Sequence, residues 1–226
     1  MTATLLDLGR RPYREAWALQ RTLHAAVAAG ARDETWIVVE HDPVITLGRS
    51  AKARHLHLSR EALAVRGVDC CDVERGGDVT YHGPGQVVVY PIRRLERFRE
   101  IVPLVTALEA ATIEACSHFG VRAERWSAHR GVYVGNDQIC AIGLAVHKMT
   151  SMHGIALNAS TRLDYDCLIT PCGISERGIT SLSRETGRHI SFDDAKPALL
   201  RALAQTFSLE FVPSSGAAPM PEAAIA

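Results

Sequence analysis

A glycine-rich stretch, RGGDVTYHGPGQ from Arg75 to Gln86, constrains the fold of this chain more than any other feature. Its four glycines allow positive φ angles and close approach of the backbone to a ligand or to a neighbouring strand. Arg75, Thr80 and His82 supply hydrogen-bonding groups that suit a carbonyl or an acid. Taken alone, the stretch is explained as well by a Gly/Pro turn between two strands.

The length and composition of the chain favour a single hydrophobic core. The chain has 226 residues, 47% of them hydrophobic, and no linker-like segment divides it. We therefore predict one domain over residues 1–212. Residues 213–226 are rich in Pro, Ala and Ser, and we expect them to form a disordered tail.

The charge pattern argues against nucleic-acid and membrane partners. The formal net charge is zero, so the chain lacks the basic footprint of such proteins. The N-terminus has no signal-peptide core and no apolar run has the length of a membrane helix, so we expect a cytoplasmic protein. The arginines at positions 93, 94, 97 and 99 are candidates for a local basic patch facing a carrier protein, although a solvated segment explains each arginine equally well.

The cysteines and histidines do not form a metal-binding pattern. Six cysteines lie at positions 70, 71, 116, 140, 167 and 172, without CxxC spacing. We expect reduced, mostly buried thiols, with one reactive cysteine at most. His55 and His57 alternate as ligands on a strand would, but without a third ligand we interpret them as surface residues and predict no metal site.

Apolar periodicity and turn residues locate the secondary structure. The sequence predicts helices over residues 13–29, 59–64, 101–118 and 191–207. It predicts strands over residues 35–40, 44–47, 68–74, 87–91, 122–125, 131–134, 139–146 and 154–157. The glycine-rich stretch would then connect two strands that hold it rigidly.

Five motifs together resemble one known family. Besides RGGDVTYHGPGQ, the chain contains HDPVITLGR (41–49), GVYVGNDQICAIG (131–143), MHGIALN (152–158) and ITPCGI (169–174). In this order they resemble the lipoyl(octanoyl) transferases, which move an octanoyl group from acyl carrier protein onto a lysine of lipoate-dependent enzymes. The resemblance covers most of the chain between Glu40 and Leu182. It implies an α/β (α+β) fold of the biotin and lipoate protein ligase type, with a mixed, mostly antiparallel sheet and helices packed on one side.

The resemblance also implies a nucleophile. The cysteine of the family's PCG motif carries the acyl group as a thioester, and here it is Cys172, which Pro171 and Gly173 exclude from regular structure. Its thiolate would attack octanoyl-acyl carrier protein, and an acceptor lysine would then take the acyl group. The acceptors implied are lipoyl domains of 2-oxoacid dehydrogenases and the glycine cleavage H protein. The resemblance implies no cofactor and no metal.

Three segments correspond to the family's acyl-binding residues, although ordinary strand packing would also explain their small side chains. The implied substrate-binding residues are Arg75, Gly76, Gly77, Asp78, Val79, Thr80, Tyr81, His82, Ala141, Ile142, Gly143, Gly154, Ile155 and Ala156. Among them, Gly143, Gly154 and Ala156 would leave room for an acyl chain. His82 would position the acyl carbonyl.

One departure from the family affects the catalytic machinery. The family places an activating lysine three residues before the AIG motif, and this chain has Gln138 there. A glutamine donates hydrogen bonds but carries no charge and accepts no proton at neutral pH. Three explanations remain open: a substituted, weakly active enzyme; a divergent enzyme activated by Lys148, His153 or His82; or a protein that binds without turnover. An ATP-dependent lipoate or biotin protein ligase, and a non-catalytic acyl- or lipoyl-domain-binding module, are the alternative functions.

Overall fold

A computed structural model of the protein describes residues 1–170 and 178–214. Within these residues the elements are, in chain order, β1 (Thr2–Arg11), α1 (Tyr13–Ala28), β2 (Thr35–His41), β3 (Val44–Leu47), η1 (Ala53–His55), α2 (Arg60–Val65), β4 (Asp69–Asp72), β5 (Val79–His82), β6 (Gln86–Ile92), η2 (Phe98–Glu100), α3 (Ile101–His118), β7 (Glu124–Trp126), β8 (His129–Val134), β9 (Asp137–His147), β10 (Thr150–Asn158), η3 (Asp164–Cys167), α4 (Leu182–Thr186), α5 (Phe192–Phe207) and β11 (Glu210–Pro213).

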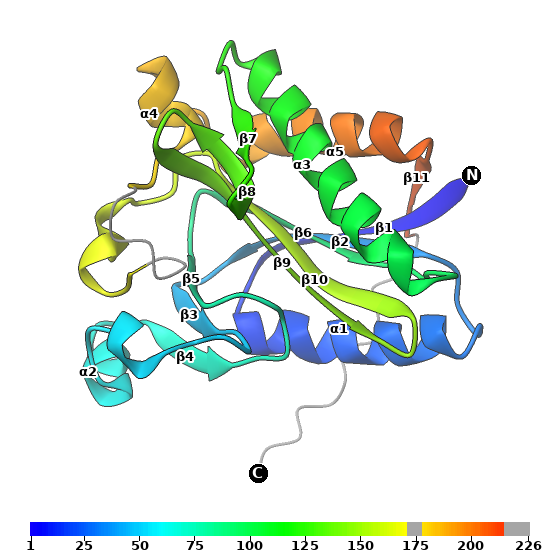
Figure 1. Ribbon diagram of the computed structural model, residues 1–226, viewed down its shortest axis with the longest axis horizontal. Helices are drawn as coiled ribbons and strands as arrows, with labels where there is room; N and C mark the ends of the chain where they lie inside the picture. Colours follow the sequence, from blue (N-terminus) through cyan, green and yellow to red (C-terminus); the bar gives the residue numbers. More distant parts are fainter. Residues whose placement is uncertain (171–177, 215–226) are drawn as a thin grey trace.

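The main sheet has eight strands in the order β11-β1-β2-β6-β10-β9-β8-β7 (Figure 1). Its pairs are antiparallel from β2 to β7, while β1 pairs with β2 and β11 in parallel. The predicted mixed, mostly antiparallel sheet is therefore confirmed.

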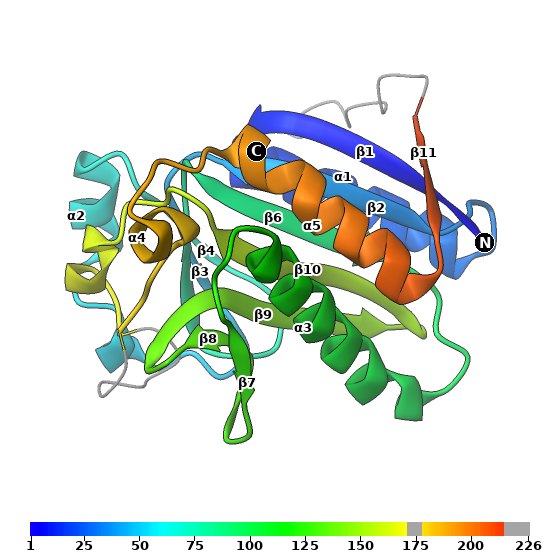
Figure 2. The same cartoon turned by 90° about the horizontal axis from the view of Figure 1, so that it is seen from above.

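Helices cover both faces of this sheet (Figures 1 and 2). On β6, Val87 and Val89 belong to the core shared with α3 and α5, whereas Val88 and Tyr90 belong to the core shared with α1. The expectation that the helices pack on one side was wrong. A central strand that is apolar on both faces needs a helical layer on each of them.

A second sheet of three strands, in the order β4-β3-β5, holds the glycine-rich stretch. β2 and β3 are consecutive in the chain but lie in different sheets. The glycine-rich stretch is also not one continuous loop, because its residues Val79–His82 form β5 against β3. This pairing fixes the middle of the stretch to a buried strand.

Two of the predicted helices begin at residues whose side chains cap the helix. Ser191 and Asp194 form a capping box at the start of α5, and Ser59 caps α2. The prediction missed β1, α4 and β11: β1 is polar over its second half, and β11 is a short, mostly exposed edge strand. In the described residues, no helix has the length and apolarity needed to cross a lipid bilayer.

Candidate active site

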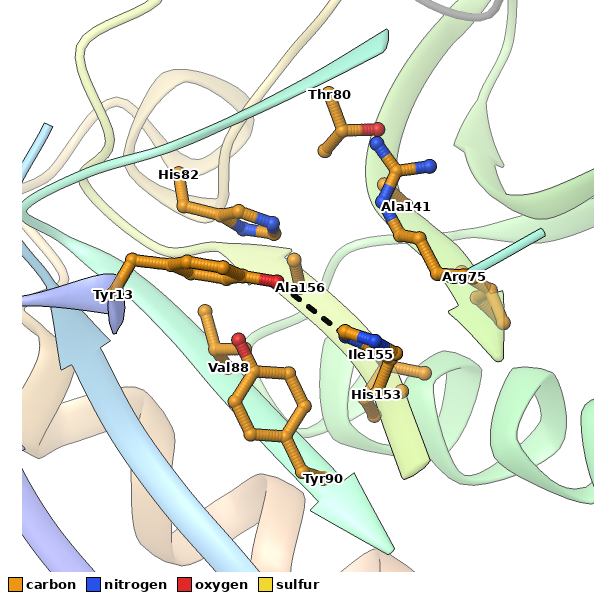
Figure 3. Close-up of a pocket in the computed structure, with 13 residues that line it drawn as sticks. Tyr13, Arg75, Thr80, His82, Val88, Tyr90, Ala141, His153, Ile155 and Ala156 are labelled. Carbon is orange, nitrogen blue, oxygen red and sulfur yellow. Dashed lines mark hydrogen bonds between the residues drawn. The ribbon is translucent and has the colours of Figure 1, made fainter. Parts of the chain in front are cut away.

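A pocket opens between α1, the glycine-rich stretch and strands β5, β6, β9 and β10 (Figure 3). About 340 Å³ of space, part of it open to solvent, lies among its walls. The lining residues are Tyr13, Arg75, Thr80, His82, Val88, Tyr90, Ala141, Ile142, Gly143, His153, Gly154, Ile155 and Ala156. The three segments implied by the family resemblance, which are far apart in the sequence, therefore meet at one pocket.

Several residues of the glycine-rich stretch do not line this pocket. Gly76, Gly77, Asp78, Val79 and Tyr81 are absent from its walls. Tyr81 instead lines a smaller neighbouring pocket, described below. Asp78 points toward His55, whose Nδ1 lies 2.5 Å from Asp78 Oδ2. Both side chains are buried, so the expectation that His55 is a surface residue was wrong.

Arg75 stands at the pocket wall and is tied to β3. Its Nη2 donates to Thr46 O at 2.7 Å and to Thr46 Oγ1 at 2.9 Å, and its Nε donates to Thr46 Oγ1 at 3.1 Å. Because these contacts are buried, the guanidinium plane is fixed before any ligand arrives.

The small residues of the wall have a different role from the one expected. A Cβ on Gly154 would overlap the backbone oxygen of Val89, and a Cβ on Gly143 would lie 3.0 Å from both Arg75 Cδ and Gly76 O. These glycines therefore allow close packing of the strands and of Arg75, rather than leaving room for an acyl chain.

The far end of the pocket, which we define by Tyr13, His41, His82, Tyr90 and His153, is a cluster of buried aromatic and imidazole rings. The Tyr13 ring stacks on His82 with centroids 5.9 Å apart, and its hydroxyl lies 3.4 Å from His153 Nδ1 (Figure 3). His41 Nε2 lies 2.7 Å from the Tyr90 hydroxyl. Hydrogen bonds between side chains thus hold this end together.

Burial keeps the three histidines neutral. It lowers the pKa of His41 to about 4 and lowers the pKa of His82 well below its ordinary value. Burial also lowers the pKa of His153, although Glu74 opposes the shift. The far end therefore carries polar groups without imidazolium charge at neutral pH.

Hydrogen bonding fixes the tautomer of His82. Its Nδ1 lies 2.8 Å from Gln86 Oε1, while Gln86 Nε2 donates to Asn158 Oδ1 at 2.9 Å. Since Gln86 Oε1 can only accept, the proton of neutral His82 lies on Nδ1. The Nε2 atom of this pocket-lining ring is then a hydrogen-bond acceptor.

His153 has an unusual backbone. Its φ is +58° within β10, and its amide donates to Gln20 Oε1 of α1 at 2.8 Å. A left-handed residue other than glycine inside a strand costs about 1–3 kcal/mol and is concentrated at functional sites. His153 Nε2 lies 3.5 Å from Glu74 Oε2, which connects β10 to the residue just before the glycine-rich stretch.

The near end of the site is a second pocket that shares Thr80, Ala141 and Ala156 with the first. Gln138 lines this pocket. Because Gln138 lies six residues before Leu144, the β9 partner of His153, Gln138 and His153 are about 20 Å apart along the strand.

Gln138 is held mainly by its backbone. Its amide donates to Gly178 O at 3.0 Å, and its carbonyl accepts from Thr180 N at 3.0 Å. Its side-chain Nε2 donates to the Tyr133 hydroxyl at 3.1 Å. The chain that resumes at residue 178 therefore pairs directly with β9 at Gln138.

Cys172 lies outside the described residues, but the chain before it is well fixed. Thr170 N donates to His55 O at 2.9 Å, and His57 N donates to Leu168 O at 2.9 Å. On the other side, residue 178 pairs with Gln138 as described above. The segment that contains Cys172 thus joins two points that border the near end.

The buried cysteines that the structure describes have little nucleophilic character. Cys70, Cys71, Cys116 and Cys140 are buried and unbridged, as expected. Burial raises the pKa of Cys71 and of Cys140 to about 12. In the part of the chain that the structure describes, no group of His, Cys, Asp or Glu is arranged to hold a metal ion.

The three candidate activating residues, Lys148, His153 and His82, differ in their distance from Gln138. Lys148 follows the end of β9, ten residues from Gln138 and therefore about 30 Å away along the strand. His153 lies at the far end, about 20 Å from Gln138. Of the three residues, only His82 lies on β5, two residues after Thr80. Thr80 lines both pockets.

Sequence reasoning missed Tyr13, Val88 and Tyr90 as lining residues. Tyr13 is the first residue of α1, and the other two belong to the buried strand that contains VVVYP. A tyrosine inside an otherwise aliphatic buried run was the available signal, because its hydroxyl requires a partner.

Comparisons with known proteins agree with this geometry. Residues 12–204 match the family described as lipoyl protein ligase A/B catalytic domain. An octanoyltransferase of Nitratidesulfovibrio vulgaris is 45% identical over 81% of this chain and 84% of its own length. One from Syntrophobacter fumaroxidans is 41% identical over 92% of each chain.

Solved structures share the fold. Lipoate-protein ligase A bound with ATP superposes with a TM-score of 0.82 at 17% identity, over 95% of this chain and 89% of the other. Biotin protein ligase from Aquifex aeolicus superposes with a TM-score of 0.53 at 14% identity, over 92% and 70%. The predicted biotin and lipoate protein ligase fold is confirmed.

Proposed function

The chain belongs to the lipoyl protein ligase A/B catalytic-domain family, and from this premise we propose how its residues transfer an octanoyl group for protein lipoylation. The activity is that of an acyltransferase, as in the octanoyltransferases that align with most of the chain. The observation that carries the proposal is the continuous site along β9 and β10, from the pocket of Figure 3 to Gln138.

The pocket between Ala141–Gly143 and Gly154–Ala156 receives the acyl chain. Ile142, Ile155 and Val88 supply apolar contact, which suits an alkyl group. The far end contributes hydroxyl and imidazole groups that are already bonded to one another. The acyl tail therefore ends against a wall of polar side chains in which Tyr13 bonds to His153 and Tyr90 bonds to His41.

The transfer takes place in two balanced steps. First, the Cys172 thiolate attacks the thioester carbon of octanoyl-acyl carrier protein, forming an enzyme thioester and releasing the carrier as a thiolate. Second, the ε-amine of a lipoyl-domain lysine attacks the enzyme thioester. An amide forms, the Cys172 thiolate leaves, and the amine loses one proton. Neither step requires ATP.

The residues near Gln138 perform the supporting roles. The Gln138 amide is a neutral donor that can stabilise an oxyanion but cannot remove the proton of the incoming amine. Among the groups considered, the Nε2 acceptor of His82 is the best placed to take that proton. The very low pKa of His82 makes it a weak base, so slow turnover is expected.

The donor is octanoyl-acyl carrier protein, and the acceptors are lipoyl domains of 2-oxoacid dehydrogenases and the glycine cleavage H protein. We place the reaction in the cytoplasm, where the buried, unbridged cysteines would stay reduced.

Intact-mass spectrometry after incubation with octanoyl-acyl carrier protein tests the proposal. We expect a mass increase of one octanoyl group without ATP, its absence in Cys172→Ser, and its loss when a lipoyl domain is added. The matched control is Cys71→Ser, which removes a buried thiol of raised pKa and should leave acylation unchanged. Acylation that needs ATP, or that persists in Cys172→Ser, would contradict the mechanism.

A further inference from the structure

The segment Arg49–Arg54, which we call the rim, runs along the glycine-rich stretch. Its backbone faces that stretch: Arg49 N donates to Arg75 O at 3.0 Å, Ser50 N donates to Gly77 O at 3.0 Å, and Lys52 N lies 3.3 Å from Asp78 Oδ1. The side chains of Arg49, Lys52 and Arg54 are exposed, and Arg54 Nε donates to His55 Nε2 at 3.3 Å.

A buried pair fixes the rim in place. His55, directly after the rim, bonds to Asp78 with both side chains only 10% exposed. The backbone of His55 also accepts from Thr170 N at 2.9 Å. The rim is therefore fixed both to the acyl pocket and to the chain leading to Cys172.

The rim carries an unbalanced positive charge. Arg49, Lys52 and Arg54 are exposed, and none forms an ion pair with a described residue. Two other exposed arginines do form ion pairs, Arg60 with Asp72 and Arg162 with Asp164. In a chain of zero net charge, three such cations in six residues form a local surplus.

The basic segment considered from the sequence lies elsewhere. Arg93 pairs with Glu34 at 3.6 Å and packs over the Phe207 ring. Arg97 directly precedes η2 and Arg99 lies within it, just before α3 begins. Figures 1 and 2 both place the start of α3 at the opposite end of the main sheet from β3 and β5. A carrier bound there would lie far from the near end.

We propose that the rim docks an acidic face of the carrier protein that delivers the acyl group. The inference rests on the proposed function and adds a surface to it. Carboxylates on the carrier would meet the three exposed cations, while the acyl chain enters the pocket beneath. The carrier, not the acceptor, is the occupant, because a carrier holds its thioester on a long flexible arm and can rest beside the site. An acceptor lysine is a short side chain, so its domain must sit over Cys172 itself.

Direct binding separates docking from catalysis. The dissociation constant for octanoyl-acyl carrier protein is measured at low and high salt for the unaltered enzyme, for Lys52→Gln/Arg54→Gln, and for the charge-matched control Arg97→Gln/Arg99→Gln. We expect the rim variant to bind about tenfold more weakly at low salt and the control to bind normally, since exposed pairs contribute about 0.2–1 kcal/mol each. The difference should shrink at high salt through screening.

Two further measurements complete the test. Acylation of Cys172 by neutral octanoyl-pantetheine should be equal in all three proteins, which shows that the rim variant retains its pocket. Equal carrier affinity in the rim variant, a control that weakens as much, or a loss confined to lipoyl-domain binding would each overturn the docking proposal. Failure of the unaltered enzyme to become acylated would instead contradict the proposed function, because the binding result does not depend on turnover.

Discussion

The two ends of the site are built in different ways. At the far end, hydrogen bonds between buried side chains connect Tyr13 to His153 and His41 to Tyr90. At the near end, the backbone of Gln138 bonds to residues 178 and 180. Its side-chain amide donates to the Tyr133 hydroxyl. A substitution at the far end therefore disturbs structure, whereas one at position 138 changes chemistry and leaves the strand in place.

This difference explains how the chain can carry Gln138 and still fold. The pleat of β9 depends on main-chain pairing with β8 and β10, which does not depend on the side chain at that position. Side chains at the far end cannot be replaced without disturbing the structure, because each ring there is both packed and hydrogen-bonded. Changes at either end of the site therefore test whether chemistry and structure can be separated in this way.

Gln138→Lys should produce the largest change, in rate and not in stability. A lysine at the near end supplies a cation that lowers the pKa of Cys172 and a group that can relay a proton. We expect octanoyl transfer to rise by about 10²–10⁴-fold, the usual contribution of a positioned acid or base. Steady-state transfer to a lipoyl domain measures it, and the pH dependence of Cys172 alkylation shows whether the thiol pKa falls.

Gln138→Met is the matched control, because it keeps the length of the side chain without charge or donor. It should remain as slow as the unaltered enzyme or slower. If Gln138→Lys leaves transfer unchanged, the view that the near end lacks its activating cation must be abandoned. An apparent Cys172 pKa already well below about 8.5 in the unaltered enzyme would have the same consequence.

Acid should destabilise the far end. His41 has a pKa of about 4 when folded, against 6.5 ordinarily, because burial disfavours its charged form. The unfolded chain therefore binds a proton between these values that the folded chain does not. The stabilising contribution is complete above about pH 6.5 and is lost as the pH falls toward 4. From pH 7 to pH 4.5, His41 alone should reduce the free energy of unfolding by about 2–3 kcal/mol.

Urea unfolding of His41→Asn at the two pH values isolates this contribution. Each protein is compared with itself, so a general loss of stability in the variant does not affect the result. The decrease between pH 7 and pH 4.5 should be smaller in His41→Asn than in the unaltered protein and unchanged in His118→Asn, which alters an exposed histidine. An equal decrease in His41→Asn would mean that the far end is not acid-sensitive through this ring.

The predictability of the two ends from sequence also differs. The wall segments Ala141–Gly143 and Gly154–Ala156 followed from the motifs, and helices such as α1 and α3 followed from their apolar periodicity. Tyr13 and Tyr90 could not be assigned to the site, because a tyrosine in a helix or a buried strand has the same local pattern whether it faces core or pocket. Only the crossing of α1 over β6 and β10 decides this.

The smallest effect concerns the glycine pair of the wall, where Gly154 and Gly143 face each other in register on β10 and β9. Gly154→Ala places a methyl group against the Val89 backbone oxygen and 2.8 Å from Pro91 Cδ, so β6 and β10 must shift apart. We expect a loss of about 2 kcal/mol in the free energy of unfolding, within the range for overpacking. Gly143→Ala should cost less, because one of its two closest neighbours, Arg75 Cδ, belongs to a side chain. Thermal unfolding of both variants measures the difference, and a larger loss in Gly143→Ala would show that Arg75 is held more rigidly than the sheet itself.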